Sequence, residues 1–350
     1  DVKIGRWIGI GKGLLKQLRA GIRGKSRLIT RLLEYSLPIP LKIINEVTYA
    51  TTVKHLASSQ VEKTFVTISP DQSEQTTIAA FLDRETAKID ELVAEQRRLM
   101  ELLKEKRQAV ISHAVTKGLN SNAPMKPSGV EWLGDVPAHW RVGKCGFYLT
   151  ILSGFAFPSS GFSEVELSRK LLRGINVGVS RLKWDETVYW KREPDDGLDI
   201  YEMRAGDLVI GMDRPLIAEG IRLAKVKESD LPCLLLQRVA SLKSGNQLNP
   251  DYLLALLSSE MFVAHFAPET TGVSVPHISP EQIYNYVIPV PPIGEQDKIA
   301  GYLDGEIPKF DTWTTEAQRA SHPLHKRRPG RTSASHPAQL AVLALYGLGV

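Results

Sequence analysis

The longest regular pattern of apolar and polar residues lies between residues 71 and 117. No Gly or Pro interrupts it, apolar residues recur at three- and four-residue steps, and Gly118 follows as a helix stop. The pattern predicts one helix of about 68 Å at 1.5 Å per residue. Such a helix needs packing along most of its length, so we expect a partner helix rather than the alternative, a solvated amphipathic helix on a globular body. The expected pairing positions are Leu82, Ile89, Leu92, Leu99, Leu103 and Val110.

The start of this helix is repeated 221 residues later. Residues 70–90 and 291–311 are identical at ten of 21 positions, which include the pairs Glu74-Gln75 and Glu295-Gln296. Two copies so far apart indicate one module used twice, with a separate domain between them. After Asp311 the second copy loses its heptads, and Pro308 interrupts its pattern, so we expect only a helix start over 290–313.

The residues between the two copies mix strand and helix patterns. Residues 119–129 have the composition of a linker, and residues 130–289 form the predicted domain. We expect strands over 171–177, 188–191, 207–212, 221–226 and 234–242, a helix over 250–266 and a short helix that opens at Ser279-Pro280. The predicted fold class is therefore α+β, with one mixed α/β domain flanked by long coiled-coil helices over 63–118 and 290–313.

The two ends of the chain do not follow this plan. Residues 1–31 carry a formal charge of +8 and residues 317–350 one of +5, so residues 32–316 carry −8 within a net charge of +5. The basic character therefore comes from the ends. We interpret residues 1–62 and 314–350 as sequence foreign to the repeated module, either a remnant or a product of another reading frame, and expect the tail to be disordered.

Composition excludes several classes of protein. The chain is 43% hydrophobic and 24% charged, which is ordinary globular chemistry, and no apolar run approaches the ~20 residues of a membrane span. Cys145 and Cys233 are interpreted as buried thiols of a cytoplasmic protein. The eight histidines show no metal-ligand spacing and no nucleophile elbow is present, so we expect a chain without catalytic residues, metal or cofactor of its own.

A basic stretch inside the middle domain points to nucleic acid. Between residues 169 and 192, seven Lys and Arg residues are interleaved with one Asn and three aromatic residues. Arg and Asn can fork onto purine edges, and Lys binds phosphates. An ordinary mixed-charge surface is the alternative, since residues 126–289 hold 17 basic and 20 acidic residues. The candidate DNA-binding residues are Arg173, Asn176, Arg181, Lys183, Arg214 and Arg238.

These segments also resemble a known family. The repeated stretch 70–90, together with residues 102–118, resembles the conserved region of type I restriction-modification specificity subunits. Residues 129–140 and 206–213 look like the entry and a strand of the target-recognition domain of that family, and residues 288–296 resemble its next conserved region. The likeness covers about residues 63–313.

The resemblance implies double-stranded DNA as the ligand. In this family an antiparallel pair of long helices separates two target-recognition domains. Each domain reads half of a bipartite target, and the helices dock the methyltransferase subunits. Restriction subunits join the complex; S-adenosylmethionine and ATP with Mg are used by those partners, and the specificity subunit itself is not an enzyme.

The chain departs from the family pattern in having one recognition domain, one complete helix and one stub. We therefore expect a truncated or half-subunit form, which either restores two domains as a homodimer through residues 71–117 or is an inert remnant. The competing hypothesis is a coiled-coil scaffold that docks partner subunits without reading DNA selectively.

Overall fold

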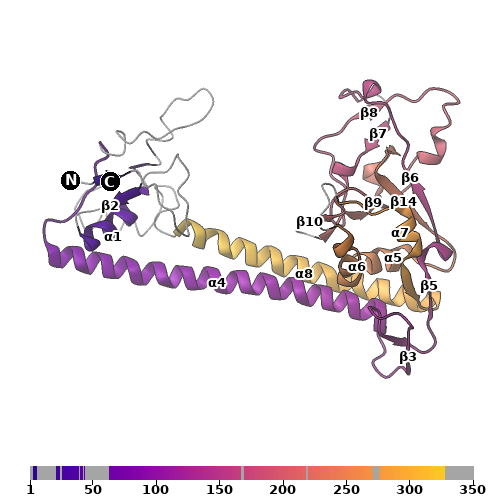
Figure 1. Ribbon diagram of the computed structural model, residues 1–350, viewed down its shortest axis with the longest axis horizontal. Helices are drawn as coiled ribbons and strands as arrows, with labels where there is room; N and C mark the ends of the chain where they lie inside the picture. Colours follow the sequence, from indigo (N-terminus) through magenta and orange to yellow (C-terminus); the bar gives the residue numbers. More distant parts are fainter. Residues whose placement is uncertain are drawn as a thin grey trace. The chain divides into compact units, whose positions relative to one another are not determined.

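A computed structural model describes residues 3–5, 21–23, 26–38, 40, 41, 43, 63–166, 169–217, 220–270 and 276–327 (Figure 1). The chain divides into two units, the first made of Asp1–Leu103 and Thr312–Val350 and the second of Lys104–Asp311. Most of residues 1–62 and 314–350, which we expect to be foreign to the repeated module, lies outside the described residues. None of the helices in the described ranges is long and apolar enough to cross a membrane.

In the first unit a short helix packs on the start of a long one. The described elements before the long helix are β1 (Lys3–Gly5), β2 (Gly21–Arg23), which pairs with β1 in antiparallel fashion, and α1 (Arg27–Ser36). Leu33 of α1 and Leu82 of the long helix are both buried. The Tyr35 hydroxyl of α1 donates a hydrogen bond to the Asp83 carboxylate of the long helix at 2.6 Å, which joins the two helices.

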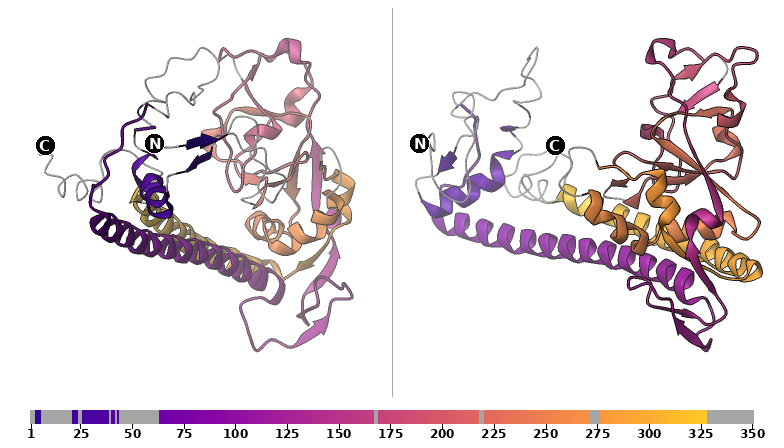
Figure 2. Two further views of the ribbon diagram at one scale, coloured as in Figure 1. Left: turned by 60° about the vertical axis from the view of Figure 1, so that its left-hand side comes forward. Right: turned by 45° about the vertical axis from the view of Figure 1, so that its right-hand side comes forward.

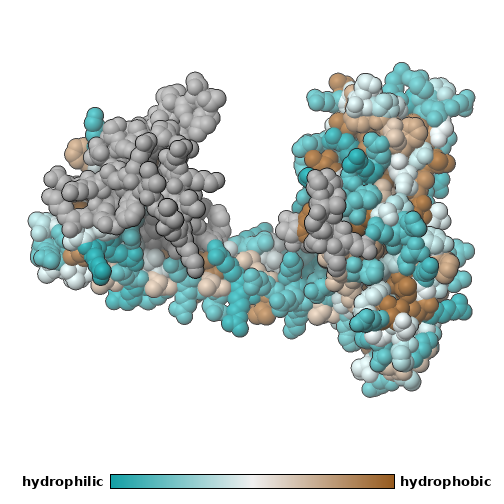
Figure 3. Space-filling view, in the orientation of Figure 1, coloured by the Kyte–Doolittle hydropathy of each residue, from teal (hydrophilic) through white to brown (hydrophobic). Residues whose placement is uncertain are grey.

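The long helix α4 (Gln72–Lys117) confirms the predicted uninterrupted helix. Its buried and half-buried face runs through Leu82, Ile89, Val93, Gln96, Met100, Leu103 and Val110. Four of the six expected pairing residues belong to this face, but Leu92 and Leu99 are 50% and 44% exposed. The three- and four-residue steps place Val93 on the inner face and turn Leu92 away from it. Single apolar side chains accordingly interrupt the hydrophilic surface of α4 (Figure 3).

The second unit contains two sheets and agrees with the predicted α+β class. The predicted strand 171–177 is only partly confirmed, because a strand covers residues 171 and 172 while residues 174–176 form a 3₁₀ helix. The antiparallel four-stranded sheet has the order β12-β9-β14-β6 and consists of β6 (Leu149–Ser153), β9 (Leu208–Gly211), β12 (Leu223–Lys225) and β14 (Val239–Ser244). The three-stranded sheet has the order β13-β7-β8 and consists of β7 (Arg169–Leu172), β8 (Tyr189–Trp190) and β13 (Cys233–Leu235). The predicted strand 234–242 is thus two strands, separated by a turn at 237–238.

Short strand pairs complete the second unit. They are β3 (Met125–Pro127) with β4 (Asp135–Pro137), β5 (Arg141–Lys144) with β15 (Val287–Val290), and β10 (Leu216–Ile217) with β11 (Gly220–Ile221), all antiparallel. The first pair gives a strand to the predicted linker 119–129. The pairing of β15 with β5 joins the two ends of the domain, because these strands lie far apart in the sequence.

Three helices lie between the four-stranded sheet and the start of α8 (Figure 2). They are α5 (Pro250–Leu257), α6 (Glu260–Thr270) and α7 (Pro280–Asn285), and α8 spans Ile293–Arg327. The hydroxyl of fully buried Tyr252 in α5 lies 3.0 Å from the Val115 carbonyl of α4 and 2.9 Å from the Pro289 carbonyl of β15. One buried side chain therefore links three elements of the core.

Within the second unit, the end of α4 and the start of α8 run antiparallel (Figure 1). Arg107 and Asp311 form an ion pair at 3.3 Å, and Val115 shares one core with Ile299 and Leu303. The expected partner helix for this part of α4 is therefore the second copy of the repeat in the same chain.

Helix α8 corrects the expectation of a short helix start that ends at residue 313. It continues to Arg327 and includes Pro308. A proline removes one backbone hydrogen bond, but buried Leu303 and Phe310 on either side hold the helix in place. Beyond residue 313 the inner face of α8 continues through small residues such as half-buried Thr314 and buried Ala317. A search for heptads of large apolar residues does not detect such a face.

Candidate nucleic-acid interface

Several loops meet at one end of the four-stranded sheet. Because β9 and β14 are antiparallel and Gly211 pairs with Val239, the residues that leave β9 lie beside those that enter β14. The Met212 backbone N–H donates to the Arg238 carbonyl at 2.9 Å. The Arg214 N–H donates to the Pro276 carbonyl at 2.7 Å, which brings a third segment to the same place.

Asp213 connects the side chains of these loops. Its carboxylate accepts hydrogen bonds from the Arg238 guanidinium and, at 2.8 Å, from Nδ1 of His277. Burial raises the pKa of the Asp213 carboxyl, but the hydrogen bonds from Arg238 and His277 outweigh burial and hold this pKa below its ordinary value. Asp213 therefore stays ionised as an anchor for both partners at neutral pH.

Arg222 joins a fourth loop to this cluster. Its Nε donates to the Val177 carbonyl at 2.9 Å and its Nη1 to the Asp213 carbonyl at 3.2 Å. Burial lowers the pKa of Arg222, while the nearby Asp213 carboxylate acts in the opposite direction. The loop that starts at Val177 carries the exposed side chains of Arg181 and Lys183. We call the exposed residues Arg181, Lys183, Arg214 and Arg238 the basic cluster, which half-buried Arg222 supports from within.

The backbone of these loops is strained at three non-glycine residues. Ser180, Arg214 and Arg238 have φ values of 60°, 45° and 68°. Positive φ is unfavourable for residues with a side chain and persists only where the surrounding structure fixes it. Three of the four non-glycine residues with positive φ in the described part of the chain belong to these loops. Strain of this kind concentrates where side chains are held ready for a ligand.

The structure divides the predicted DNA-binding residues into two groups. Arg181, Lys183, Arg214 and Arg238 are exposed, and the loops above bring them to one end of the sheet. Asn176 is only 1% exposed; its Oδ1 accepts from the Arg173 N–H at 3.0 Å and its Nδ2 donates to the Lys183 carbonyl at 2.9 Å. Because both amide groups are used inside the loop, the expectation that Asn176 contacts a base is corrected.

Arg173 also points into the fold. Its side chain is half-buried, and its Nη2 donates to the Glu186 carbonyl. We therefore assign Arg173 and Asn176 to the support of the loop that carries Arg181 and Lys183.

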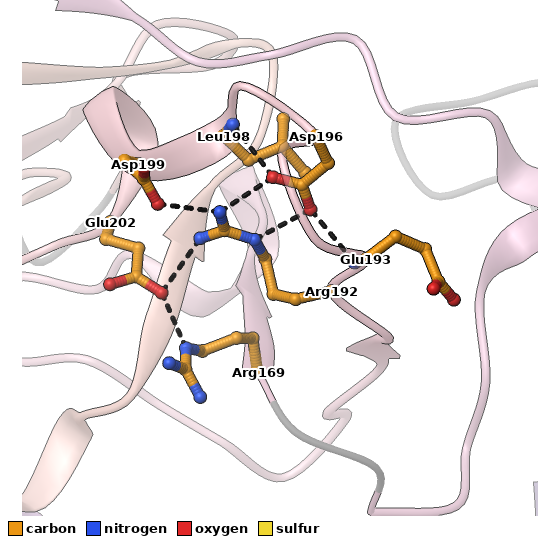
Figure 4. Close-up of polar contacts among 7 residues, drawn as sticks. All are labelled: Arg169, Arg192, Glu193, Asp196, Leu198, Asp199 and Glu202. Atoms are coloured by element: carbon orange, nitrogen blue, oxygen red, sulfur yellow. Dashed lines mark hydrogen bonds and ion pairs between the residues drawn. The ribbon is translucent and has the colours of Figure 1, made fainter.

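Two other arginines of the basic stretch are held by acidic residues (Figure 4). Arg192 bonds to Asp196 and Asp199 at 2.7 Å and to Glu202 at 3.0 Å, and Arg169 also reaches Glu202 at 2.7 Å. The hydrogen bonds to Asp196 and Asp199 raise the pKa of Arg192. The number of Lys and Arg residues between 169 and 192 therefore suggests a more positive surface than the folded chain presents.

Sequence reasoning missed Asp213, Arg222 and His277. Asp213 directly follows the predicted strand 207–212, and its place at the end of a strand was the signal that could have identified it as a site residue. His277 and Arg222 lie 64 and nine residues away from Asp213 in the sequence, so only the folded chain brings them together. In the part of the chain that the structure describes, no three His, Cys, Asp or Glu side chains are grouped as metal ligands.

Comparisons with known proteins agree on one type of relative. The chain is 33% identical over 208 residues to the type I restriction enzyme EcoAI specificity subunit of Escherichia coli, which covers 59% of this chain and 34% of that protein. It is 28% identical over 297 residues to the type I restriction enzyme MjaVIII specificity subunit of Methanocaldococcus jannaschii, which covers 83% of this chain and 67% of that protein. The chain thus spans about a third of the length of the first relative and about two thirds of the second.

A solved structure described as showing complex assembly and conformational transition of the type I R-M system matches with a TM-score of 0.64. The match has 16% sequence identity and covers 85% of this chain and 67% of that chain. At this identity the likeness supports the fold alone. No family model matches the sequence.

Proposed function

Because the chain belongs to the family of type I restriction enzyme specificity subunits, we propose that it reads DNA sequence. In this proposal residues 130–289 recognise one half of a bipartite target, and the long helices dock methyltransferase subunits, through which restriction subunits join the complex. S-adenosylmethionine and ATP with Mg would act in those partners, while this chain supplies recognition and no catalysis. We place this activity in the cytoplasm, which fits two buried cysteine thiols without a disulfide.

The basic cluster is the observation that carries the proposal. It brings together cations from several loops at one end of a sheet, and the backbone is strained at two of them, Arg214 and Arg238. Exposed Arg side chains can fork onto guanine edges, and the neighbouring Lys can bind phosphate. A region that only supported a helical scaffold would not need strained loops that present arginines.

A binding titration tests the function. The full chain, alone and with its modification subunit, is titrated with a random-sequence duplex library of about 40 base pairs, and bound duplexes are sequenced. Enrichment of a defined sequence supports recognition. Complex formation with the modification subunit without any enrichment would instead support the scaffold hypothesis.

A matched pair of variants locates the interface. Arg214 leaves β9 at the basic cluster, whereas exposed Arg204 precedes β9 at the other end of the strand. Arg214→Ala should weaken binding of the enriched sequence by roughly 1–3 kcal/mol relative to random duplex. Arg204→Ala removes the same charge from the same domain and should leave this selectivity unchanged.

A further inference from the structure

Asp213 is an acidic residue at the centre of a surface that we propose binds a polyanion. A carboxylate near DNA phosphates repels them and opposes the release of counterions that favours binding. The Asp213 side chain is 23% exposed, so DNA docked on the basic cluster would come close to this carboxylate. The position of this acid therefore needs a reason beyond charge.

Its contacts give that reason. One carboxylate oxygen accepts from Arg238 and the other from His277, while the Asp213 backbone carbonyl accepts from Arg222. Because His277 holds the second oxygen, the carboxylate cannot turn to follow Arg238. The Arg238 guanidinium is thus anchored at one edge by a carboxylate whose own orientation is fixed.

Arg238 nevertheless remains open to solvent. Its side chain is 68% exposed although one of its nitrogens is bonded to Asp213. A guanidinium has five N–H donors in a rigid plane, so anchoring one edge leaves the other donors to a ligand. The left-handed backbone at Arg238, with φ of 68°, fixes the root of the same side chain.

We propose that Asp213 is a positioning residue that orients Arg238 to read a guanine in the major groove. This inference rests on the proposed function and deepens it. A guanidinium fork donates to O6 and N7 of guanine, and no other base offers two acceptors in that arrangement. Anchoring by Asp213 removes rotamer freedom before DNA binds, so less entropy is lost when the two hydrogen bonds form.

The test compares Asp213→Asn with a matched control, Asp199→Asn. Asp199 is 88% exposed and its partner Arg192 keeps Asp196 and Glu202, so this variant removes the same charge from the same domain without disturbing Arg238. The full chain with its modification subunit first selects its sequence from the random duplex library, which gives the base preference at every position. Each variant is then measured against the selected duplex, duplexes with one guanine replaced, and random duplex.

For Asp213→Asn we expect the preference for one guanine to fall about tenfold, while affinity for random duplex stays the same or rises. A loss of guanine preference without a loss of affinity for random duplex distinguishes positioning from loss of folding, because unfolding lowers both affinities. It also differs from relief of charge repulsion, which would raise the affinity for all duplexes alike. Asp199→Asn should keep the guanine preference. The inference is overturned if Asp213→Asn keeps that preference within about twofold, or if Asp199→Asn loses it equally.

A second variant keeps the test decisive if Asp213→Asn folds poorly. Arg238→Lys retains the charge but not the fork, and it should lose preference at the same guanine. If both residues act through one contact, the double variant should be no less selective than Arg238→Lys alone. Additive losses, or losses at different base positions, refute the positioning role while leaving DNA recognition intact. A wild-type chain that selects no sequence overturns the proposed function itself.

Discussion

Gln296 permits a sharp test of how the repeated Glu-Gln pair works in the fold. This side chain is completely buried. Its Oε1 accepts from the Asn249 N–H at 2.8 Å, and its Nε2 donates to the Gln247 carbonyl at 2.9 Å and the Pro291 carbonyl at 2.8 Å. It therefore fastens the start of α8 to the segment that caps α5. Gln75, its equivalent in the first copy, is half-buried, and its Nε2 donates to the Ser69 carbonyl at 2.7 Å.

The contacts set the expected magnitude. A neutral hydrogen bond contributes about 1 kcal/mol net, and buried backbone groups left without a partner add to the loss. Gln296→Ala breaks three bonds and leaves three backbone groups without this partner, so the free energy of unfolding should fall by about 3 kcal/mol or more. Gln75→Ala breaks one bond at a half-buried site and should lower it by about 1 kcal/mol.

Urea unfolding followed by circular dichroism and tryptophan fluorescence measures both variants against the parent chain. A loss for Gln296→Ala that is no larger than for Gln75→Ala would refute the reasoning, because the two residues occupy identical places in the repeat. Gln296→Glu provides a further check. It keeps an acceptor for Asn249 but turns an oxygen toward two carbonyls, so it should be at least as destabilising at neutral pH.

Three further predictions concern the corrected residues and the anchor. Asn176→Ala should lower the free energy of unfolding by about 2 kcal/mol, measured by urea titration, because two buried hydrogen bonds are lost. Val93→Asp should reduce the helicity and stability of α4 by circular dichroism far more than Leu92→Asp, since Val93 is 8% and Leu92 50% exposed; similar losses would contradict the assigned inner face. Arg238 and His277 hold the pKa of the Asp213 carboxyl below its ordinary value of 3.8. The stabilisation that ionised Asp213 gives to the fold is therefore complete above pH 3.8 and is lost as the pH falls through the folded-state pKa. NMR titration of the Asp213 carboxyl checks this direction, and a midpoint above about 4 contradicts it.

Periodicity predicts the elements of this chain well, because it records which side of an element is buried. The helix over 71–117 is confirmed within one residue, and each predicted strand of the middle domain has a counterpart. The errors arose where burial does not depend on large apolar residues. Leu92 and Leu99 were assigned to the pairing face because they are large and apolar, although both are exposed. Gln96 and Met100, which are half-buried, were not assigned to it. Small residues hid the continuation of α8 for the same reason.

The site was less predictable than the fold, because residue type does not show what a side chain already binds. Arg192 and Arg238 are alike in sequence terms, yet Arg192 is shared among three carboxylates and only 19% exposed, whereas Arg238 has one carboxylate and is 68% exposed. The same holds for Asn176, whose amide completes a loop instead of facing outward. Only tertiary contacts separate cations that support the fold from cations that remain open to a ligand.

In the proposed function, the charge of residues 32–316 fits selective reading of DNA better than general attraction to it. Residues 32–316 carry a net −8, so this part of the protein would repel phosphates while the basic cluster would attract them locally. Non-specific binding scales with the number of phosphates neutralised, and few are neutralised when cations gather at one end of one sheet. Contacts with base edges then make up a larger share of the total affinity. On this reasoning an anionic anchor such as Asp213 would weaken binding to random sequence and sharpen the choice of one base, and both effects would favour discrimination between sequences.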